Sequence, residues 1–534
     1  MNSFPEALLN RSGSWGFAVL GGGMILLAVG LWLYNSQGSK SKYPLPPGPK
    51  GSPIIGNLRQ VPAERSWVQF AKWAEEYKSD IIYVNLLGQP VIVLNSVKSA
   101  VDLLDKKGVI YSDRPSFAVL EALGFKNNLA LIGDGTQWRK LRKAYGKFLS
   151  ARSSLVYRDA QQKHAHEMAD EIEKCPEKWH GYLSRFATRV IFSMAFAIEV
   201  ADEDDPYFNL AEKMGWILSN MGNNGITVLD IAPWGKSNLA ATFGEKYGLM
   251  RPVTVVEHLP RWIGKFITSV KYVHDYAPTI EEFHQRPFDA VMRNFKAGTL
   301  EPSFVGRLIE ARETNKADEE EAIKSFTNAE LKGTGGSLYS AGQDTTYSTE
   351  TIFVMAMVLT PKVQTLAQKE IDAVTGGTRL PTFDDWKTLP IVERIVYETM
   401  RFHPAVPNGV PHRTLKEDVY RDMYIPKANA WAMLHDPDVY KDPFKFNPDR
   451  FLPVSKGGLS EPIPVGHFGF GRRVCPGQYL GFASVWIVVA TILAKFNISP
   501  VKDKDGKDIM PKLEFSTGIT SHPAPFSCIF TPRN

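Results

Sequence analysis

Ten residues near the carboxyl end constrain this chain more than any other segment, Phe468-Gly469-Phe470-Gly471-Arg472-Arg473-Val474-Cys475-Pro476-Gly477. The glycines permit close backbone approach and positive-φ turns that a side chain would forbid. Free amides in such a loop can point at the sulfur of Cys475, and the cations Arg472 and Arg473 favour its thiolate over its thiol form. We therefore expect a loop that presents one thiolate, with the apolar ring of Phe468 beside it.

A thiolate held in this way suits iron in a porphyrin, and the spacing F-x-x-G-x-R-x-C-x-G is met at every fixed position. We predict that Cys475 is the axial ligand of haem iron. A lone cysteine is otherwise a small buried hydrophobe, and we keep that interpretation for Cys175 and Cys528, which lack such a loop. Three cysteines without paired spacing also argue against a disulfide framework or a structural zinc site.

Composition indicates a large globular body with one membrane segment. Apolar residues make up 44% and charged residues 22% of the 534 residues, which excludes a disordered, collagen-like or multi-span protein. The net charge of +5 is too small over this length to suggest nucleic-acid binding. Residues 15–34 are almost wholly apolar and long enough to cross the hydrocarbon core as one helix. A cleaved signal peptide is the alternative, but no A-x-A-like cleavage site follows the apolar run.

Four segments are predicted along the chain. A short lumenal segment (1–14) precedes the transmembrane anchor (15–34), a basic and proline-rich linker (35–52) follows, and the catalytic domain occupies 53–534. Lysines after the anchor predict that this domain faces the cytosol. The linker contains Tyr43-Pro44-Leu45-Pro46-Pro47-Gly48-Pro49 and is expected to be a stiff spacer.

The catalytic domain is expected to be mostly α-helical with small β-sheets (α+β). Residues 81–86 and 90–94 read as a strand pair around Gly88. Thr327 and Glu330 form a capping-box signature that opens a long helix ending before Pro361. A second helix is predicted between Pro390 and Pro404.

With these features the sequence resembles the cytochrome P-450 family of haem-thiolate monooxygenases, over essentially the whole chain after the anchor. More narrowly, it is similar to fungal microsomal members of secondary metabolism, of the O-methylsterigmatocystin oxidoreductase-like type. The motif Pro411-His412-Arg413-Thr414 and the ending Thr520-Ser521-His522-Pro523-Ala524-Pro525-Phe526 carry that narrower likeness. The resemblance implies the cytochrome P-450 fold, haem b, and hydroxylation or another oxidation of a hydrophobic small molecule.

The run Ala341-Gly342-Gln343-Asp344-Thr345-Thr346 falls inside the long helix. Glycine and consecutive polar side chains are poor helix interior, and threonine hydroxyls can bond back to the preceding turn. Asp344 exchanges protons and Thr345 donates a hydroxyl, which suits delivery of protons to bound dioxygen. Matching residues have that role in the family, so Asp344 and Thr345 are the predicted catalytic pair.

Two further groups of residues are expected to support the cofactor. Glu398 and Arg401 share one helix face at i, i+3, and the resemblance adds Arg450 from Phe446-Asn447-Pro448-Asp449-Arg450-Phe451 as the third member of a structural network. Trp138 and Arg142, at i, i+4, can pair with a haem propionate. His412 and Arg473 match further propionate-contacting positions of the family, with Arg413 as the substitute for His412 if the register differs by one.

Electrons must come from another protein, because no NADPH or flavin motif is evident in the sequence. The resemblance implies NADPH–cytochrome P-450 reductase, docking on a basic proximal face near Cys475, with cytochrome b5 as a second candidate. It also implies a single-pass protein of the endoplasmic reticulum membrane. Segments after Ser112-Asp113-Arg114-Pro115, around 216–224 and near 518–521 are expected to line the substrate pocket, with Phe117, Leu120 and Leu123 suggesting an apolar cavity.

Two alternatives remain open. Some haem-thiolate relatives are isomerases or dehydratases, although the intact pair Asp344 and Thr345 argues against that route. The chain could instead bind haem without activity, because residues 235–252 look like an extra segment. Relatives also usually carry about five more residues, which form a short strand, near 427–428.

Overall fold

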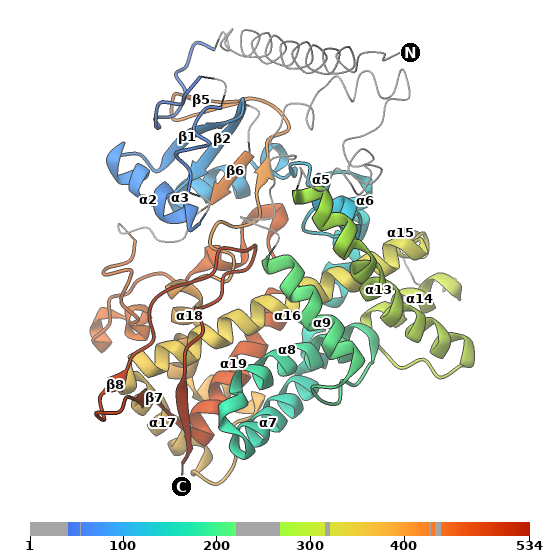
Figure 1. Ribbon diagram of the computed structural model, residues 1–534, viewed down its shortest axis with the longest axis vertical. Helices are drawn as coiled ribbons and strands as arrows, with labels where there is room; N and C mark the ends of the chain where they lie inside the picture. Colours follow the sequence, from blue (N-terminus) through green and yellow to red (C-terminus); the bar gives the residue numbers. More distant parts are fainter. Residues whose placement is uncertain are drawn as a thin grey trace, which may run out of the picture.

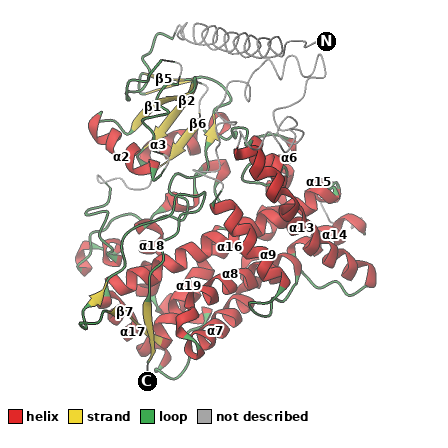
Figure 2. Cartoon of the chain, viewed as in Figure 1, coloured by secondary structure: helices red, strands yellow, loops and turns green. Residues whose placement is uncertain are grey.

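Helices make up most of this structure, a computed structural model that describes residues 41–533 apart from 54, 63, 221–267, 315–320, 427–428 and 433–438 (Figures 1 and 2). The described helices are, in chain order, α2 (Ser66–Glu76), α3 (Val97–Ala100), α4 (Gly108–Tyr111), α5 (Ala118–Leu120), α6 (Thr136–Phe148), α7 (Arg158–Lys174), α8 (Trp179–Phe196), α9 (Pro206–Ser219), α13 (Thr268–Ala297), α14 (Phe304–Glu313), α15 (Glu321–Lys324), α16 (Asn328–Leu359), α17 (Pro361–Thr375), α18 (Pro390–Phe402) and α19 (Gln478–Lys495). The described strands are β1 (Ile81–Leu86), β2 (Gln89–Leu94), β3 (His412–Arg413), β4 (Asp418–Tyr420), β5 (Met423–Ile425), β6 (Asn429–Ala432), β7 (Phe496–Lys502), β8 (Asp508–Ile509) and β9 (Cys528–Pro532).

The long helix α16 crosses the helical part of the molecule (Figure 1) and packs against α8 and α19. Its start follows from the predicted capping box: the amide of Glu330 donates to the Thr327 hydroxyl (3.2 Å), and the amide of Thr327 donates to the Glu330 carboxylate (2.8 Å). Its end follows from Pro361, which begins α17 instead of continuing α16. Both boundaries agree with the sequence prediction, as do the bounds of α18.

Helix α19 forms the centre of one of the two large cores. It is apolar around its whole circumference, and it packs against α7, α16, α17 and α18. Among the described residues it is the one helix long and apolar enough to cross a membrane, with a mean hydropathy of 1.4, yet 67% of it is buried inside the protein. We therefore assign α19 to the core. The predicted anchor at residues 15–34 and the segment 1–14 lie outside the described residues.

The strands form three small sheets, of which the largest has the order β1-β2-β6-β3. β1 and β2 form the predicted antiparallel pair, and β6 joins β2 in parallel and β3 in antiparallel orientation. Sequence analysis raised the loss of a strand near residues 427–428, whereas β6 follows that point and is paired on both sides. Residues 427–428 themselves, like the apparent insertion at 235–252, lie outside the described residues.

The later part of the predicted linker packs on the body. The amide of Tyr83 in β1 donates to the carbonyl of Pro47 (2.9 Å), and the amide of Tyr424 in β5 donates to that of Pro44 (2.7 Å). A Cβ at Gly48 would lie 2.0 Å from the Tyr83 carbonyl oxygen, so the chain can approach β1 this closely only with glycine there. Residues 44–48 are thus held on two sheets.

A buried carboxyl group in α16 has no function in the predicted relay. Glu350 is fully buried, and neither of its carboxylate oxygens has a hydrogen-bond partner among the described residues. Burial raises the pKa of Glu350 well above its ordinary value. The folded protein therefore holds this proton to a higher pH than the unfolded chain does.

We expect Glu350→Gln to stabilise the protein increasingly as the pH rises. Below the ordinary carboxyl pKa, Glu350 of the unsubstituted protein is protonated in both the folded and the unfolded state. Above that pKa the unfolded chain releases the proton, whereas the folded protein retains it. The advantage of the variant should grow by up to about 1.4 kcal/mol per pH unit until the pH reaches the raised pKa. Unfolding temperatures at acidic, neutral and alkaline pH measure it. Glu75→Gln on α2, where the side chain is exposed, is the control; equal pH dependence in the two variants would contradict the prediction.

Candidate active site

Two short 3-10 turns, Val465–Phe468 and Gly471–Arg473, precede Cys475 in its loop, and α19 begins three residues after it. Gly469 and Gly471 have positive φ angles of 78° and 54°, and a Cβ at Gly471 would lie 2.2 Å from the carbonyl oxygen of Leu104. The amide of Cys475 donates to the carbonyl of Phe468 (2.8 Å), which closes the loop. The glycines are therefore required in the way that the sequence predicted.

Burial raises the pKa of the Cys475 thiol, while the backbone amide of Gly477 and the charge of Arg142 act in the opposite direction. The sequence predicted this favourable charge from Arg472 and Arg473, whereas Arg142 is the cation that acts on the thiol in the structure. Both guanidiniums instead lie over the ring of Trp138, at 5.6 Å and 4.1 Å from its centroid. The tight loop turns these two side chains towards α6, and α6 supplies the acting cation.

Helix α6 therefore contributes both of its predicted residues to this region. Trp138 is buried beneath the two guanidiniums, and Arg142, one turn later, donates from Nη1 to the carbonyl of Val474 (2.7 Å), next to Cys475. Burial lowers the pKa of Arg142, and the nearby Cys475 raises it.

A second guanidinium, that of Arg473, has one nitrogen that the described residues leave without a partner. Arg473 donates from Nε to the carbonyl of Ser112 (2.7 Å), but its Nη2 is buried without a hydrogen-bond partner among the described residues. Burial lowers the pKa of Arg473 to about 10. Arg114 lies nearby, and burial followed by the charge of Arg473 lowers its pKa well below the ordinary value. Buried cations of this kind need an anionic partner.

Arg114 is a residue that sequence analysis quoted only as the start of a pocket segment. Its Nη1 donates to the carbonyls of Val410 and Pro411 (both 2.7 Å), and its Nε donates to that of Ala130 (2.8 Å). It thereby ties two chain segments together beside Arg473. No sequence signal distinguished this buried arginine from an exposed one.

His412 lies in β3 at the edge of the same cluster. Its Nδ1 donates to the carbonyl of Tyr111 (2.7 Å), and burial together with the charge of Arg114 lowers its pKa well below the ordinary value. The ring is therefore neutral, with Nε2 as an acceptor. A carboxylate placed at Nε2 would raise that pKa and bind the protonated ring. Arg413, the predicted substitute for His412, instead donates from Nε to Oδ2 of Asp113 (2.7 Å).

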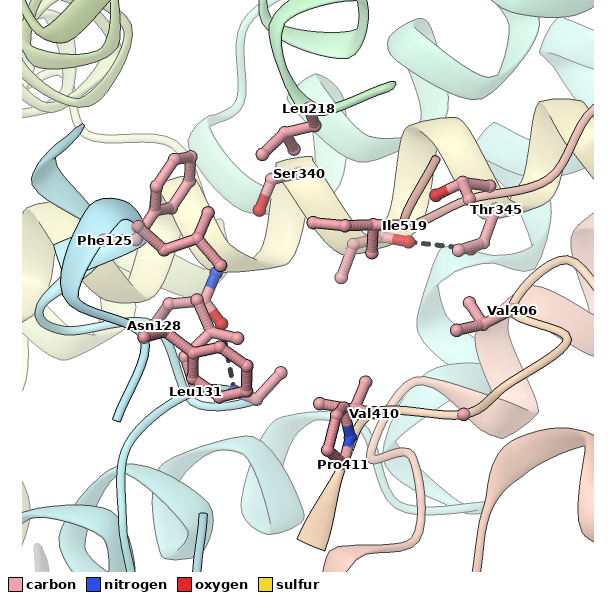
Figure 3. A pocket seen from close by; sticks show the side chains of 16 residues that line it. Phe125, Asn128, Leu131, Leu218, Ser340, Thr345, Val406, Val410, Pro411 and Ile519 are labelled. Atoms are coloured by element: carbon pink, nitrogen blue, oxygen red, sulfur yellow. Dashed lines mark hydrogen bonds between the residues drawn. The ribbon is translucent and has the colours of Figure 1, made fainter. Parts of the chain in front are cut away.

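A mainly apolar cavity adjoins these segments (Figure 3). Its lining residues are Phe117, Leu120, Phe125, Asn128, Ala130, Leu131, Leu218, Ser340, Ala341, Thr345, Val406, Gly409, Val410, Pro411, Ile519 and Thr520. All three segments that were expected to line the pocket contribute to it, whereas Leu123 is buried in the core and does not line the cavity.

Helix α16 brings the predicted relay to this cavity. The Thr345 hydroxyl lines it and bonds back to the carbonyl of Ala341 (2.7 Å), as expected from the sequence. Gly342 allows α16 to approach α8, because a Cβ there would lie 2.6 Å from Cδ1 of Ile191. Asp344 is buried, and its Oδ1 lies 3.0 Å from Nε2 of His522. Sequence analysis did not identify His522 as a partner of Asp344.

The predicted supporting network forms a buried cluster between α18 and the turn Pro448–Phe451. Arg401 binds Glu398 through Nε and Nη2 (2.8 and 2.9 Å), and Arg450 binds it through Nε (3.1 Å). All three side chains are fully buried. Glu461, which the sequence did not indicate, accepts from Nη1 of Arg450 (2.5 Å) and balances the second positive charge.

These observations fit haem. An unpartnered guanidinium nitrogen of Arg473, together with Arg142 and His412, offers groups for propionates, and Cys475 offers an axial thiolate. In the part of the chain that the structure describes, no group of three or more His, Cys, Asp or Glu side chains forms a separate metal site.

Comparison with known proteins supports the same assignment. A profile of the cytochrome P450 family matches residues 46–530. A cytochrome P450 monooxygenase of Armillaria gallica is 33% identical over 512 residues, which are 94% of this chain and 95% of that protein. Cytochrome P450 monooxygenase 208 of Postia placenta is 35% identical over 527 residues, 97% of this chain and 96% of that protein. Cytochrome P450 monooxygenase claR of Ampulloclitocybe clavipes is 35% identical over 504 residues, 92% and 87% of the two chains. The chain belongs to the cytochrome P450 family of haem-dependent monooxygenases.

Proposed function

We propose that this protein is a haem-thiolate monooxygenase that uses dioxygen and electrons from an NADPH reductase to hydroxylate or otherwise oxidise a hydrophobic small molecule, in fungal secondary metabolism. The observation that carries the proposal is the position of Thr345. Thr345 and Ser340 are the polar residues that α16 contributes to the lining of a mainly apolar cavity. Thr345 also follows the buried residue Asp344 directly in the sequence. An isomerase or dehydratase would not need that pair.

Haem b, the cofactor of the family, supplies the dioxygen chemistry when it is bound. In our proposal Cys475 would provide a thiolate ligand to the iron, with Phe468 beside it. Arg142, Arg473 and Trp138 would bind the propionates, and His412 would contribute its Nε2. The Glu398–Arg401–Arg450 network keeps the surrounding loop in place, since its carbonyl and carboxylate partners lie between residues 441 and 461.

Asp344 and Thr345 are proposed to deliver protons towards the cavity. Thr345 can release the bond to Ala341 and turn its hydroxyl, because that bond is made within the same helix turn. Asp344 has a buried Oδ2 without a hydrogen-bond partner among the described residues, which leaves one oxygen available for a proton.

The substrate class follows from the same lining. Phe117, Leu120, Phe125, Leu131 and Leu218 present mainly hydrocarbon surface, which binds an apolar scaffold by the removal of that surface from water. Asn128 and Thr520 are the polar groups that can orient a hydroxyl or carbonyl on such a scaffold. Both residues lie outside α16, in segments far in sequence from Asp344 and Thr345.

Electron supply and location belong to the same proposal. Exposed cations at i, i+4 and i+8 of α6, Arg139, Lys143 and Lys147, form a basic stripe on the helix that carries Arg142. An acidic face of NADPH–cytochrome P450 reductase, with cytochrome b5 as a second candidate, would dock there by charge complementarity. The anchor at 15–34 would hold the protein in the endoplasmic reticulum membrane with the catalytic domain in the cytosol.

The proposal is tested on the purified full-length protein. After reduction and treatment with carbon monoxide, it is expected to absorb at about 450 nm, as thiolate-ligated haem does. With the reductase it should then oxidise NADPH and consume dioxygen. A protein without that band, or one that does not consume dioxygen with the reductase, would overturn the proposal.

A further inference from the structure

The side-chain amide of Asn128 is a polar group in the cavity wall whose orientation the structure fixes. Its Oδ1 accepts from the backbone amide of Ala130 (3.0 Å). Because only the oxygen of a side-chain amide can accept, this bond assigns Oδ1 to the local turn and leaves Nδ2 as the remaining polar atom. Nδ2 forms no hydrogen bond with a described residue, and Asn128, with 9% of its surface exposed, lines the cavity.

Backbone hydrogen bonds hold the segment that carries Asn128. Its own amide donates to the carbonyl of Phe125 (3.0 Å), and its carbonyl accepts from the amides of Leu131 (3.0 Å) and Ile132 (3.1 Å). Together with the bond to Oδ1, these contacts fix the backbone and the side-chain amide before a ligand arrives. Nδ2 is therefore a preorganised donor, and binding to it costs little further conformational entropy.

The other polar side chains of the cavity wall present different groups to a ligand. The hydroxyls of Ser340 and Thr345 donate to carbonyls of the preceding turn of α16 (3.3 and 2.7 Å), so they present acceptor lone pairs. Thr520 has a hydroxyl that can either donate or accept. Among the described residues that line the cavity, Asn128 thus supplies the one side-chain group that can only donate.

Asn128 and Thr345 lie on opposite sides of the cavity in the view of Figure 3. Phe125 and Leu131 lie on the side of Asn128, and Val406 lies on the side of Thr345. Apart from the few polar groups, hydrocarbon surface lines the space between them. A ligand that contacts both sides would therefore place a polar atom at Asn128 and present a different part of its skeleton to Thr345.

We propose that Asn128 is a specificity-determining residue whose Nδ2 donates to an acceptor oxygen, such as a carbonyl, on an otherwise apolar substrate. The inference rests on the proposed monooxygenase function and names a chemical feature of its substrate. A pure hydrocarbon in the same position would remove water from Nδ2 without replacing its partner, which disfavours that ligand. The substrate therefore carries this oxygen before the protein oxidises it at the opposite end, so the reaction that supplies it is one that leaves a carbonyl or ether oxygen in place.

The test uses three probes with the same ring system, fluorenone, fluorenol and fluorene, which carry a carbonyl, a hydroxyl and a methylene group. Binding to the ferric full-length haem protein, without reductase or NADPH, is measured from the change in the haem spectrum and from the rise in unfolding temperature. One hydrogen bond changes affinity by about threefold to tenfold. The ratio of the fluorene to the fluorenone dissociation constant should therefore fall by about that factor in Asn128→Leu.

Asn128→Asp is a second variant with almost the same shape. One carboxylate oxygen can still accept from the amide of Ala130, and at about pH 8, far above the ordinary carboxyl pKa, the other oxygen replaces the donor by an acceptor. The preference for fluorenol, whose hydroxyl can donate, over fluorenone should therefore be greater in N128D than in the native protein. Because this variant retains the turn, it tests the donor even where N128L loses stability.

Asn85→Asp is the matched control, because Oδ1 of Asn85 also accepts from a backbone amide in a local turn, that of Gly88 (2.7 Å), outside the cavity lining. Its ratios of dissociation constants should equal those of the native protein. Unchanged ratios in both N128L and N128D would overturn the role of Asn128; if the variants also lose haem, Nδ2 serves a propionate instead. Absence of binding by all three probes to a native protein that has the band near 450 nm would likewise overturn this role alone. A native protein without that band would overturn the proposed function.

Discussion

Replacing Cys475 by serine is expected to abolish the absorption band near 450 nm and all oxidation of NADPH that depends on the reductase. The hydroxyl of serine is a far weaker acid than a thiol and cannot supply a thiolate-like ligand, so the iron would lose the electron donation that the proposed chemistry needs. The two interactions that favour the thiolate, from the Gly477 amide and Arg142, would have no comparable group to act on. The carbon monoxide spectrum and the haem content of the purified variant measure the effect.

Cys528→Ser provides a matched control for that substitution. Cys528 lies in β9, and burial raises the pKa of its thiol to about 12. Like Cys475, it is therefore a thiol that is largely removed from water. It has no glycine-rich loop, and we expect the variant to keep the band and its position. Loss of the band in C528S, or its persistence in C475S, would contradict the assignment of the axial ligand.

Arg450→Leu is expected to destabilise the protein by about 3–5 kcal/mol, because it leaves buried carboxylates without their partner. Arg450 binds Glu398 and Glu461 and also donates to the carbonyls of Lys441 (2.9 Å) and Lys445 (2.9 Å). Its removal therefore also frees the chain that precedes the Cys475 loop. Thermal or denaturant unfolding of the purified variant measures the loss, and reduced haem content should accompany it.

Arg379→Leu is the control for this prediction. Arg379 makes a bidentate ion pair with Asp385 (2.6 and 2.7 Å), but 47% of its side chain is exposed, so its loss should amount to about 0–1 kcal/mol. A double variant, R450L with Glu461→Leu, should recover part of the stability because it also removes an unpaired buried carboxylate. A loss in R450L no larger than in R379L would show that the network contributes little to the fold.

Local signals predicted several elements of the fold. The capping box of Thr327 and Glu330 and the proline at 361 set the two ends of α16, because a helix end depends on groups within a few residues of it. The hairpin β1–β2 follows from two short, largely apolar runs on either side of Gly88. The glycines of the Cys475 loop were predicted for a similar reason: positive φ angles and close contacts restrict residue type directly.

The sequence predicted which residues belong to the site better than it predicted which charged groups act on one another. Arg472 and Arg473 are adjacent in sequence to Cys475, yet Trp138 and the carbonyls of a distant segment engage them, and Arg142 acts on the thiol instead. Neighbours in sequence need not be neighbours in space, since the tight loop directs both arginine side chains towards Trp138 on α6. Resemblance to the family identified Arg142 for the cofactor, but not for this electrostatic effect on the sulfur.

The sequence by itself determined the glycine-rich thiol loop and the long helix with Asp344 and Thr345, because each depends on spacing within one segment. The network of Glu398, Arg401 and Arg450 was predicted through the family resemblance, which supplied Arg450 from a separate segment. Only the tertiary structure decided which groups complete them: Glu461 beside Arg450, Arg114 beside Arg473, and His522 beside Asp344. These partners come from segments far apart in the chain, and the energy of a buried charge depends on which groups packing brings within a few ångströms of it.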